Sequence, residues 1–470
     1  MCVILLCLFH CLDVLFYDLA YCVCDVGLRI SILSKMKTHI FTPTLPKEVL
    51  YILESLQSAG YEAYIVGGCV RDMLLAQNSH IPYVINDYDI TTSALPQEVM
   101  KLFAHTIHTG LKYGTISVLI ESQSYEVTTF RIDGSYINAR SPKNVTFTCS
   151  LAQDLQRRDF TINALAYAPC SGLIDEVGGL ADLQHKRIVC VGDAFARLNE
   201  DILRILRALR FSSTLGFEID SHTKEAIFSL SSKVCLIAKE RIRVEFTKLL
   251  CGAWVKVVLD EFRFVISEIL PQMREIIANN TLWQHTLSML DNLTPRSHTL
   301  AWVAFLYHTD ELKARDILQS LKFDTYNKDY ICSLLVYVKK PLDNNPTTLK
   351  TMLVDMGGRK KGEAMFKDML KLKVAVINAQ DTADKAQKLQ MLDSIHSLLE
   401  CVLASSVPLE LKELCLNGRD LIYIGVPKGK RIGEILHFLH QEVLHERVSN
   451  TKEALLSKAQ AFLQTKKSEI

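Results

Sequence analysis

The pattern of apolar and polar positions changes once along the chain, near residue 175. Before that point, residues 46–60 repeat apolar side chains at helical spacing, and short runs rich in β-branched residues, such as "YDITT" and "GTISVLI", are typical of strands. Beyond it, nearly every segment has the period of an amphipathic helix, and Pro and Gly mark the helix ends. The pattern predicts an α+β chain with a small mixed α/β head and an all-helical remainder.

We expect five segments within this frame. They are an extension (1–35), a mixed α/β head (36–172), a helical neck (173–250), a helical body (251–350) and a helical tail (351–470). Two stretches carry a more specific expectation. "TTFRIDGSYINARSP", from Thr128, is expected to be a mobile loop near the functional site, and "EDILRILRALRF", from Glu200, a continuous helix.

The N-terminal extension differs from the rest of the chain. It is apolar but interrupted by Asp13, Asp18 and Asp25, and no basic residue precedes Arg29, so the basic start of a signal peptide is missing. The uncharged run ends at Asp13, which is too short to span a bilayer. We hypothesise that Met36 is the biological start, with a membrane-associated segment as the alternative. Sequencing the N-terminus of the native protein would separate the two.

Composition narrows the classes of function. Hydrophobic residues make up 49% of the chain and charged residues 22%, as in ordinary globular proteins. The net charge is +1, so a nucleic-acid partner requires a local basic face. Of the 14 cysteines, none after residue 25 forms a Cys-x-x-Cys pair, which disfavours a zinc site or a disulfide framework. Free thiols in a reducing compartment, and hence a cytoplasmic protein, fit this distribution.

Two carboxylates, Asp87 and Asp89, lie one residue apart where a strand is expected. Side chains at i and i+2 of a strand point to the same face, so the two carboxylates converge and repel unless a cation lies between them. Mg²⁺ takes such hard oxygen ligands together with substrate phosphates. An isolated Asp-x-Asp is more often a solvated strand edge.

The glycines of "VGGCVRD" favour the metal interpretation of that pair. Gly67 and Gly68 stand between an expected strand and an expected helix, where backbone N–H groups can approach a phosphate. Arg71 lies in the first turn of that helix. Gly-Gly at such a place is usually just a tight turn. Combined with Asp87 and Asp89, it predicts a nucleoside triphosphate site with its metal ions.

A second candidate site is the run from Glu200 to Arg210. Asp201 and Arg204 are three residues apart, which would place them on one face of a helix, and Arg207 continues that spacing. An ionised Asp only accepts and an Arg only donates, so the pair complements the amino group and ring nitrogen of cytosine or adenine. Uracil and guanine present the reverse order. A salt-bridged amphipathic helix is the alternative explanation.

Five motifs in this order resemble class II CCA-adding tRNA nucleotidyltransferases and the closely related bacterial poly(A) polymerases. They are "VGGCVRD", "DYDITTSA", "RRDFTINALAY", "EDILRILRALRF" and "ERIRVEFTKLL", which together span about residues 64–250. Both groups belong to the polymerase β-type nucleotidyltransferase superfamily, so the resemblance implies that fold for the head. It also implies that Asp87 and Asp89 bind catalytic Mg²⁺ while Gly68 and Arg71 hold the triphosphate.

The same resemblance implies roles for the remaining motif residues. Asp201 and Arg204 would read the base, and Arg158, Arg207 and Arg210 would bind the nucleotide. The implied reaction adds CCA to the 3′ end of tRNA from CTP and ATP and releases pyrophosphate. The implied partners are tRNA, ATP and CTP, with no membrane, and the chain is expected to be a monomer or a homodimer.

Several points stay open at this level. Poly(A) or A-only addition uses the same motifs, and a catalytically inactive RNA-binding protein or an HD-type phosphohydrolase are more distant alternatives; Thr309 after His308 argues against a working HD site. Glu126 is a candidate third carboxylate on a neighbouring strand.

The "MLLAQNSHIPYVIN" segment between Asp72 and Asp87 is longer than the family commonly has, which we interpret as a loop insertion. Basic residues of the tail, as in "GVPKGKRIGEIL", are candidates for contact with the tRNA backbone.

Overall fold

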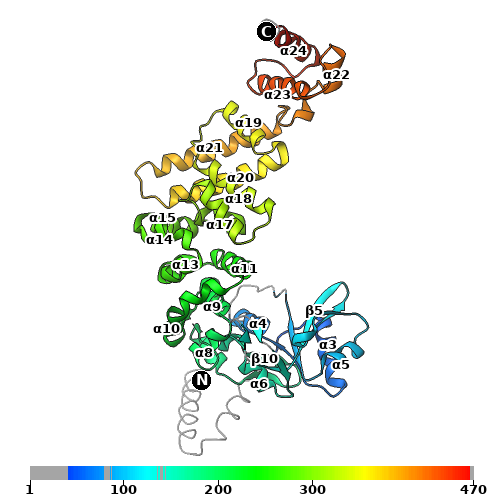
Figure 1. The fold of residues 1–470 in the computed structure, drawn as a ribbon, viewed down its shortest axis with the longest axis vertical. Coiled ribbons are helices and arrows are strands. Elements are labelled where there is room, and N and C mark those ends of the chain that lie inside the picture. The colour runs from blue at the N-terminus through cyan, green and yellow to red at the C-terminus, as the bar shows by residue number, and fades with distance from the viewer. Residues whose placement is uncertain are drawn as a thin grey trace, which may run out of the picture. The chain divides into compact units, whose positions relative to one another are not determined.

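The computed structural model describes residues 41–78, 85, 87–134, 136–137, 141–142 and 144–465. The prediction that Met36 is the biological start lies outside these residues, as does half of the longer segment before Asp87. The chain divides into two compact units, Met1–Arg204 with Phe217–Leu230, and Ile205–Gly216 with Ser231–Ile470 (Figure 1). Each unit is described by itself. The boundaries of head, neck, body and tail stay predictions.

A seven-stranded sheet forms the centre of the first unit, with the order β11-β10-β1-β2-β5-β4-β3. Its strands are β1 (Ala63–Val66), β2 (Asp89–Thr92), β3 (Thr106–Gly110), β4 (Thr115–Ile120), β5 (Gln123–Thr129), β10 (Leu165–Ala168) and β11 (Gly172–Asp175). Neighbouring strands are antiparallel except β2 and β5, which are parallel. The mixed α/β head that the sequence predicts is therefore confirmed.

Short helices surround this sheet. They are α3 (Lys47–Ser58), α4 (Gly68–Asn78), α5 (Pro96–Leu102), α6 (Leu151–Gln156), α7 (Gly179–Gln184), α8 (Ala194–Glu200) and α10 (Ser221–Leu230), with 3₁₀ turns η1 (Leu111–Tyr113) and η2 (Thr161–Asn163). Helix α3 buries Val49, Ile52, Leu53 and Leu56 on the face that its apolar spacing predicts, and it contacts β1. A small parallel pair, β12 (Arg187–Ile188) with β13 (Glu218–Ile219), ties the segment before α10 to this unit.

The prediction of a loop at residues 128–142 is wrong for the part that the structure describes. Strand β5 continues to Thr129, and β6 (Arg131–Asp133) pairs with β9 (Val145–Phe147) while β7 (Tyr136–Ile137) pairs with β8 (Ser141–Pro142). The β-branched side chains of Ile132 and Thr146 lie opposite each other in the β6–β9 ladder. Such cross-strand pairs stabilise short ladders. The sequence did not predict these strands, because turn-forming residues lie between them.

The second unit is helical, as expected. Helix α9 (Leu203–Leu215) begins in the first unit and continues in the second. The other helices are α11 (Lys239–Leu250), α12 (Val255–Glu261), α13 (Arg263–Ile269), α14 (Arg274–Ala278), α15 (Asn280–Asp291), α16 (His298–Phe305), α17 (Glu311–Ser320), α18 (Thr325–Lys339), α19 (Pro346–Asp355), α20 (Gly358–Asn378), α21 (Lys385–Ala404), α22 (Gly418–Tyr423), α23 (Lys430–Leu444) and α24 (Lys452–Thr465), with 3₁₀ turns η3 (Ser231–Leu236), η4 (Pro271–Met273) and η5 (Leu411–Glu413). Within the described residues, we find no helix with the length and apolar character that crossing a membrane requires.

Large aromatic side chains fill the core between α11, α15 and α16. Phe246, Trp302 and Phe305 are fully buried, and the ring of Phe246 lies 5.4 Å from that of Trp302 and 5.2 Å from that of Phe305. The indole N–H of Trp302 donates a hydrogen bond to Oγ1 of Thr247 at 2.8 Å, so its polar atom is satisfied. These contacts join α11 to α16 in one hydrophobic core.

Helices α19 and α20 approach closely at Gly362. A Cβ atom on Gly362 would lie 2.3 Å from the carbonyl oxygen of Leu353. Because backbone cannot move aside as a side-chain tip can, this glycine sets the distance between the two helices.

We therefore expect Gly362→Ala to destabilise the chain by about 1–3 kcal/mol through overpacking. Gly433→Ala, on α23, is the matched control, because no atom lies within 4 Å of its added Cβ. There the better helix propensity of Ala should stabilise by up to about 1 kcal/mol. Urea denaturation measures both; equal effects of the two substitutions would contradict the close approach.

Candidate active site

The turn from β1 into α4 brings three predicted site elements together. Val66, the last residue of β1, lies opposite Asp89 in the antiparallel ladder. Gly67 follows with a φ of +83°, a conformation that favours glycine. A Cβ atom on Gly67 would lie 3.2 Å from Nη1 of Arg158 and 3.9 Å from Oδ2 of Asp89. The Gly-Gly turn, the carboxylate and the arginine therefore share one small space.

The carboxylates lie at the start of β2. Asp87 and Asp89 are both exposed, and Asp89 is the partner of Glu126 in the parallel β2–β5 ladder. Partial burial raises the pKa of Glu126, and the negative charges of Asp89 and Asp87 raise it further. Three carboxyl groups thus act on one another here, and Glu126 is brought beside Asp89 as the sequence suggested.

The carboxylates of Asp87, Asp89 and Glu126 are suitable ligands for a hard divalent cation. All donors are carboxylate oxygens, which Mg²⁺ prefers, and a cation among them would reverse the repulsion that raises the pKa of Glu126. In the part of the chain that the structure describes, no three His, Cys, Asp or Glu side chains are already arranged as a ligand set. A metal held here therefore needs further ligands, such as substrate phosphates or water.

Arg158 is held by Asp154, a residue that the sequence reasoning missed. The carboxylate of Asp154, in the first turn of α6, is fully buried and accepts from Nη2 of Arg158 at 3.4 Å and from Nε of Arg157 at 2.9 Å. Burial alone would raise the pKa of Asp154, but the charges of Arg157 and Arg158 outweigh burial and lower it. Nε of Arg158 is buried without a hydrogen-bond partner among the described residues.

Arg71 lies on the other side of the turn. Its guanidinium is 7% exposed, lies 3.6 Å from a Cβ built on Gly68, and donates to Oδ1 of Asn163 at 2.6 Å. Asn163 in turn donates to Asp159 at 3.1 Å. Both partners belong to the "RRDFTIN" motif, so that motif holds Arg71 as well as supplying Arg158. Asn163 is a further positioning residue that the sequence reasoning did not single out.

The prediction of one continuous helix from Glu200 is wrong. Helix α8 ends at Glu200, Asp201 is extended with φ −134° and ψ 103°, and α9 begins at Leu203. The cause is capping: the side chain of Asp201 accepts from the backbone N–H of Leu203 at 3.1 Å. Aspartate favours such caps over helix interiors. Asp201 and Arg204 therefore do not share a helical face, but they stay adjacent, since N–H of Arg204 donates to the Asp201 carbonyl at 2.9 Å.

Arg204 is anchored to the segment that carries Arg158. It is 8% exposed and donates to Oε2 of Glu200 at 2.6 Å and to the carbonyl of Arg157 at 3.3 Å. Arg197 binds the same Glu200 oxygen and the same carbonyl, at 2.9 and 3.3 Å. The end of α8 and the start of α9 are thus fixed next to Arg158, within the first unit.

Arg207 and Arg210 contact residues of the second unit. Nε of Arg210 lies 3.0 Å from Oε2 of the buried Glu245, and Nη1 of Arg207 lies 4.0 Å from Oε1. Both guanidiniums also lie over the ring of Phe211, at 4.0 and 5.4 Å. Their role in nucleotide binding stays a prediction.

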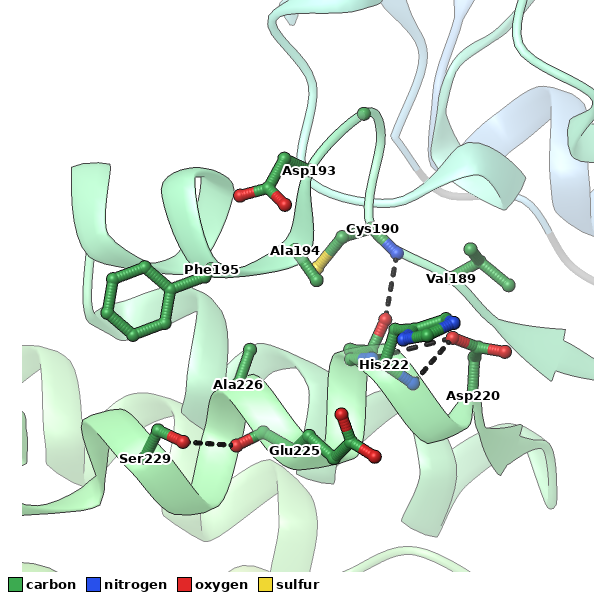
Figure 2. A pocket seen from close by; sticks show the side chains of 12 residues that line it. Val189, Cys190, Asp193, Ala194, Phe195, Asp220, His222, Glu225, Ala226 and Ser229 are labelled. Atoms are coloured by element: carbon green, nitrogen blue, oxygen red, sulfur yellow. Dashed lines mark hydrogen bonds between the residues drawn. The ribbon is translucent and has the colours of Figure 1, made fainter.

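A cavity of about 460 Å³ lies apart from these residues, between α8 and α10 (Figure 2). Phe195 and Asp193 border it from the α8 side, and His222 and Glu225 border it from α10. None of the predicted site residues lines it. It is therefore a separate feature of the first unit.

The histidines of the HD-like segment bond to each other. Nε2 of His308 lies 3.0 Å from Nδ1 of His285, and burial lowers the pKa of His308 to about 4. This contact gives both residues a structural role in the second unit.

Three family models match separate parts of the chain. Residues 63–189 match the poly A polymerase head domain, residues 216–263 a probable RNA and SrmB-binding site of polymerase A, and residues 293–459 the tRNA nucleotidyltransferase domain 2. The first match contains the β1 turn, Asp89 and Arg158.

Among curated proteins, the chain is 35% identical over 434 residues to the CCA-adding enzyme of Leuconostoc citreum, covering 90% of this chain and 99% of that protein. It is 36% identical over 428 residues to the CCA-adding enzyme of Anoxybacillus flavithermus, covering 87% and 95%. The chain belongs to the CCA-adding enzyme family. Its fold resembles that of the Bacillus stearothermophilus CCA-adding enzyme, solved in complex with CTP, with a TM-score of 0.71 and 29% identity over 91% of this chain and 100% of that one.

Membership of the CCA-adding enzyme family makes the chain a nucleotidyltransferase. Three of the five motifs that carried the resemblance, "VGGCVRD", "DYDITTSA" and "RRDFTINALAY", lie where the first unit forms its candidate site. The structure adds Asp154 to these residues; its sequence signal is its helical spacing from Arg157 and Arg158.

We expect Asp154→Asn to destabilise the chain by roughly 3–5 kcal/mol, because it leaves two largely buried arginines without their carboxylate. Asp384→Asn, at an exposed carboxylate, is the control and should change little. Chemical denaturation at several pH values measures both.

The stability that Asp154 contributes depends on pH in a definite direction. The folded-state pKa of Asp154 is lowered, so its contribution is complete above its unfolded value of about 3.9 and is lost as the pH falls toward the folded value. The difference between the wild type and Asp154→Asn should therefore shrink in acid. A difference that grows in acid would contradict the ion pairs.

Proposed function

We propose that this chain adds C, C and A to the 3′ end of tRNA, without a template, by nucleotidyl transfer from CTP and ATP. The observation that carries the proposal is the convergence of Asp89, Gly67 and Arg158 in a member of the CCA-adding enzyme family. The 3′ oxygen of the RNA attacks the α-phosphorus of the nucleotide, a new P–O bond forms, and the bond to pyrophosphate breaks. The 3′ hydroxyl proton leaves to solvent or a nearby base.

Asp87 and Asp89 hold the cation, and Glu126 is the candidate for a third carboxylate. Mg²⁺ bound there would lower the pKa of the 3′ hydroxyl and stabilise the leaving pyrophosphate. Arg71 and Arg158 neutralise the triphosphate, and the backbone at Gly68 lets it approach the helix α4 terminus. Because Asp154 and Asn163 fix both arginines, little reorganisation accompanies binding.

Asp201 and Arg204 read the base in this proposal. The anchoring of Arg204 on Glu200 and on the Arg157 carbonyl supports it, because a fixed guanidinium discriminates between donor and acceptor patterns better than a mobile one. The proposal gives tRNA binding to the tail (351–470) and further nucleotide contacts to Arg207 and Arg210. The nine cysteines of the described residues are free thiols, in keeping with a cytoplasmic location.

Asp87→Asn and Asp89→Asn should each lower CMP incorporation at least about 1,000-fold, because each removes a charged ligand of the cation. Both residues are exposed, so the urea midpoint should stay near that of the wild type. Glu121→Gln, also an exposed carboxylate of the head, is the control and should retain activity. The assay is tRNA lacking CCA with each NTP singly and in pairs. Unlimited A addition by the wild type would instead support a poly(A) polymerase.

Asp201→Ala should raise misincorporation of UMP about 10- to 100-fold, since the carboxylate no longer faces the uracil carbonyl unfavourably. Asp201→Ser retains a side-chain oxygen for the cap on Leu203 N–H, so it separates base reading from helix capping. Relaxed base choice in both variants supports base reading. Relaxation only in the Ala variant would attribute the effect to the lost cap.

A further inference from the structure

Four lysines line one pocket of about 290 Å³ in the second unit. Lys339 and Lys340 lie at the end of α18, Lys373 lies on α20 and Lys388 on α21. The rest of the lining is apolar or aromatic, and it contains no carboxylate among the described residues. The apolar lining consists of Val338, Pro341, Leu342, Val376, Ile377 and Leu392, with Met391 and Tyr307 beside them.

Most of this positive charge has no negative partner. Lys388 pairs with Asp384 at 2.9 Å, but Lys339, Lys340 and Lys373 take part in none of the ion pairs of the described residues. Burial lowers the pKa of Lys373 to about 8, as expected where an ammonium is removed from water without a carboxylate nearby. An anion in the pocket would relieve this cost.

Helix capping explains two of the four lysines. Nζ of Lys373 donates to the carbonyls of Val338 and Lys340 at 2.9 and 2.7 Å, and Nζ of Lys339 donates to the carbonyl of Thr309 at 2.5 Å. These carbonyls end a helix or a turn and attract cations. In the described part of the chain, neither Lys340 nor Lys388 donates to a carbonyl: Nζ of Lys340 lies 4.5 Å from the ring centroid of Tyr337, and Lys388 pairs with Asp384. Helix capping therefore does not account for these two lysines.

We propose that this pocket binds a phosphate of the tRNA backbone. The inference rests on the proposed function, which makes tRNA the polyanion that this chain must hold. The pocket lies entirely within residues 293–459, the part that matches the tRNA nucleotidyltransferase domain 2. Lysines act as point charges on phosphodiesters without reading bases, which suits an enzyme that extends tRNAs of many sequences. The apolar lining offers a surface for the neighbouring ribose.

The test uses the full chain with Lys340→Gln and Lys388→Gln combined. These two are chosen because Lys339 and Lys373 cap backbone carbonyls. The matched control is Lys313→Gln with Lys328→Gln, which removes the same charge from α17 and α18, outside both the pocket and the tail. The Kd for tRNA lacking CCA is measured by filter binding at several salt concentrations, without nucleotide.

The pocket variant should bind tRNA about tenfold more weakly, and the slope of log Kd against log salt should fall by up to about 2. The control should stay within about twofold of the wild type. A pocket variant that also stays within twofold, or a wild-type chain that binds no tRNA, overturns the assignment. If the pocket variant does not fold, acetylation of wild-type lysines with and without tRNA decides instead: tRNA should protect Lys340 and Lys388 but not Lys328.

Free nucleotides are the other source of phosphate, and calorimetry with AMP distinguishes them. AMP binding that the pocket variant loses, with an unchanged Kd for tRNA, overturns the tRNA assignment. The Kd comparison does not depend on catalysis. A wild-type chain that binds tRNA but adds no nucleotide would therefore refute the proposed function and still leave this inference decided by the variants.

Discussion

The candidate site depends on one buried carboxylate, Asp154. It accepts from Arg157 and Arg158, from Oγ1 of Thr91 on β2 at 3.3 Å, and from the backbone N–H of Arg131 at 3.2 Å. These partners come from the strand that carries Asp89, from the segment after β5 and from the arginine pair. A single buried charge thus ties the arginine pair to the strand that carries Asp89.

The base-reading proposal and the triphosphate proposal are linked through the same short segment. Arg197 and Arg204 both hold the Arg157 carbonyl, one residue before Arg158. A change that moves the start of α9 therefore also moves the arginine that faces Asp89. This coupling gives a physical route by which the fit of a base could affect the alignment of its triphosphate.

Sequence reasoning went furthest where local pattern and chemistry agree. The strand, Gly-Gly turn and helix around Gly67 follow from hydrophobic runs and turn residues, whereas Glu126 was proposed as a third carboxylate because of the family resemblance, and the β2–β5 ladder places it opposite Asp89. The role of Asp154 was not predicted, because its partner Thr91 lies 63 residues away in the sequence and no local pattern indicates that contact. The helix break at Asp201 was not predicted, because the apolar residues keep helical spacing on both sides of it. The break arises because the Asp201 side chain caps the following helix. The strands at residues 131–147 were not predicted, because each of their ladders is only two or three residue pairs long.

The parallel pairing of β2 with β5 has a consequence for how the enzyme forms. Asp89 and Glu126 become neighbours only after α5, β3 and β4 have been passed, and β1 is flanked by β10, which lies about a hundred residues further along. Such non-local pairings form slowly, because the chain loses loop entropy before the contacts stabilise it. The β2–β5 pairing that joins the carboxylates is complete within residues 89–129, whereas Arg158 and β10 follow later in the chain. A head that ends before Arg158 would therefore hold the carboxylates without the arginine that lies beside Gly67.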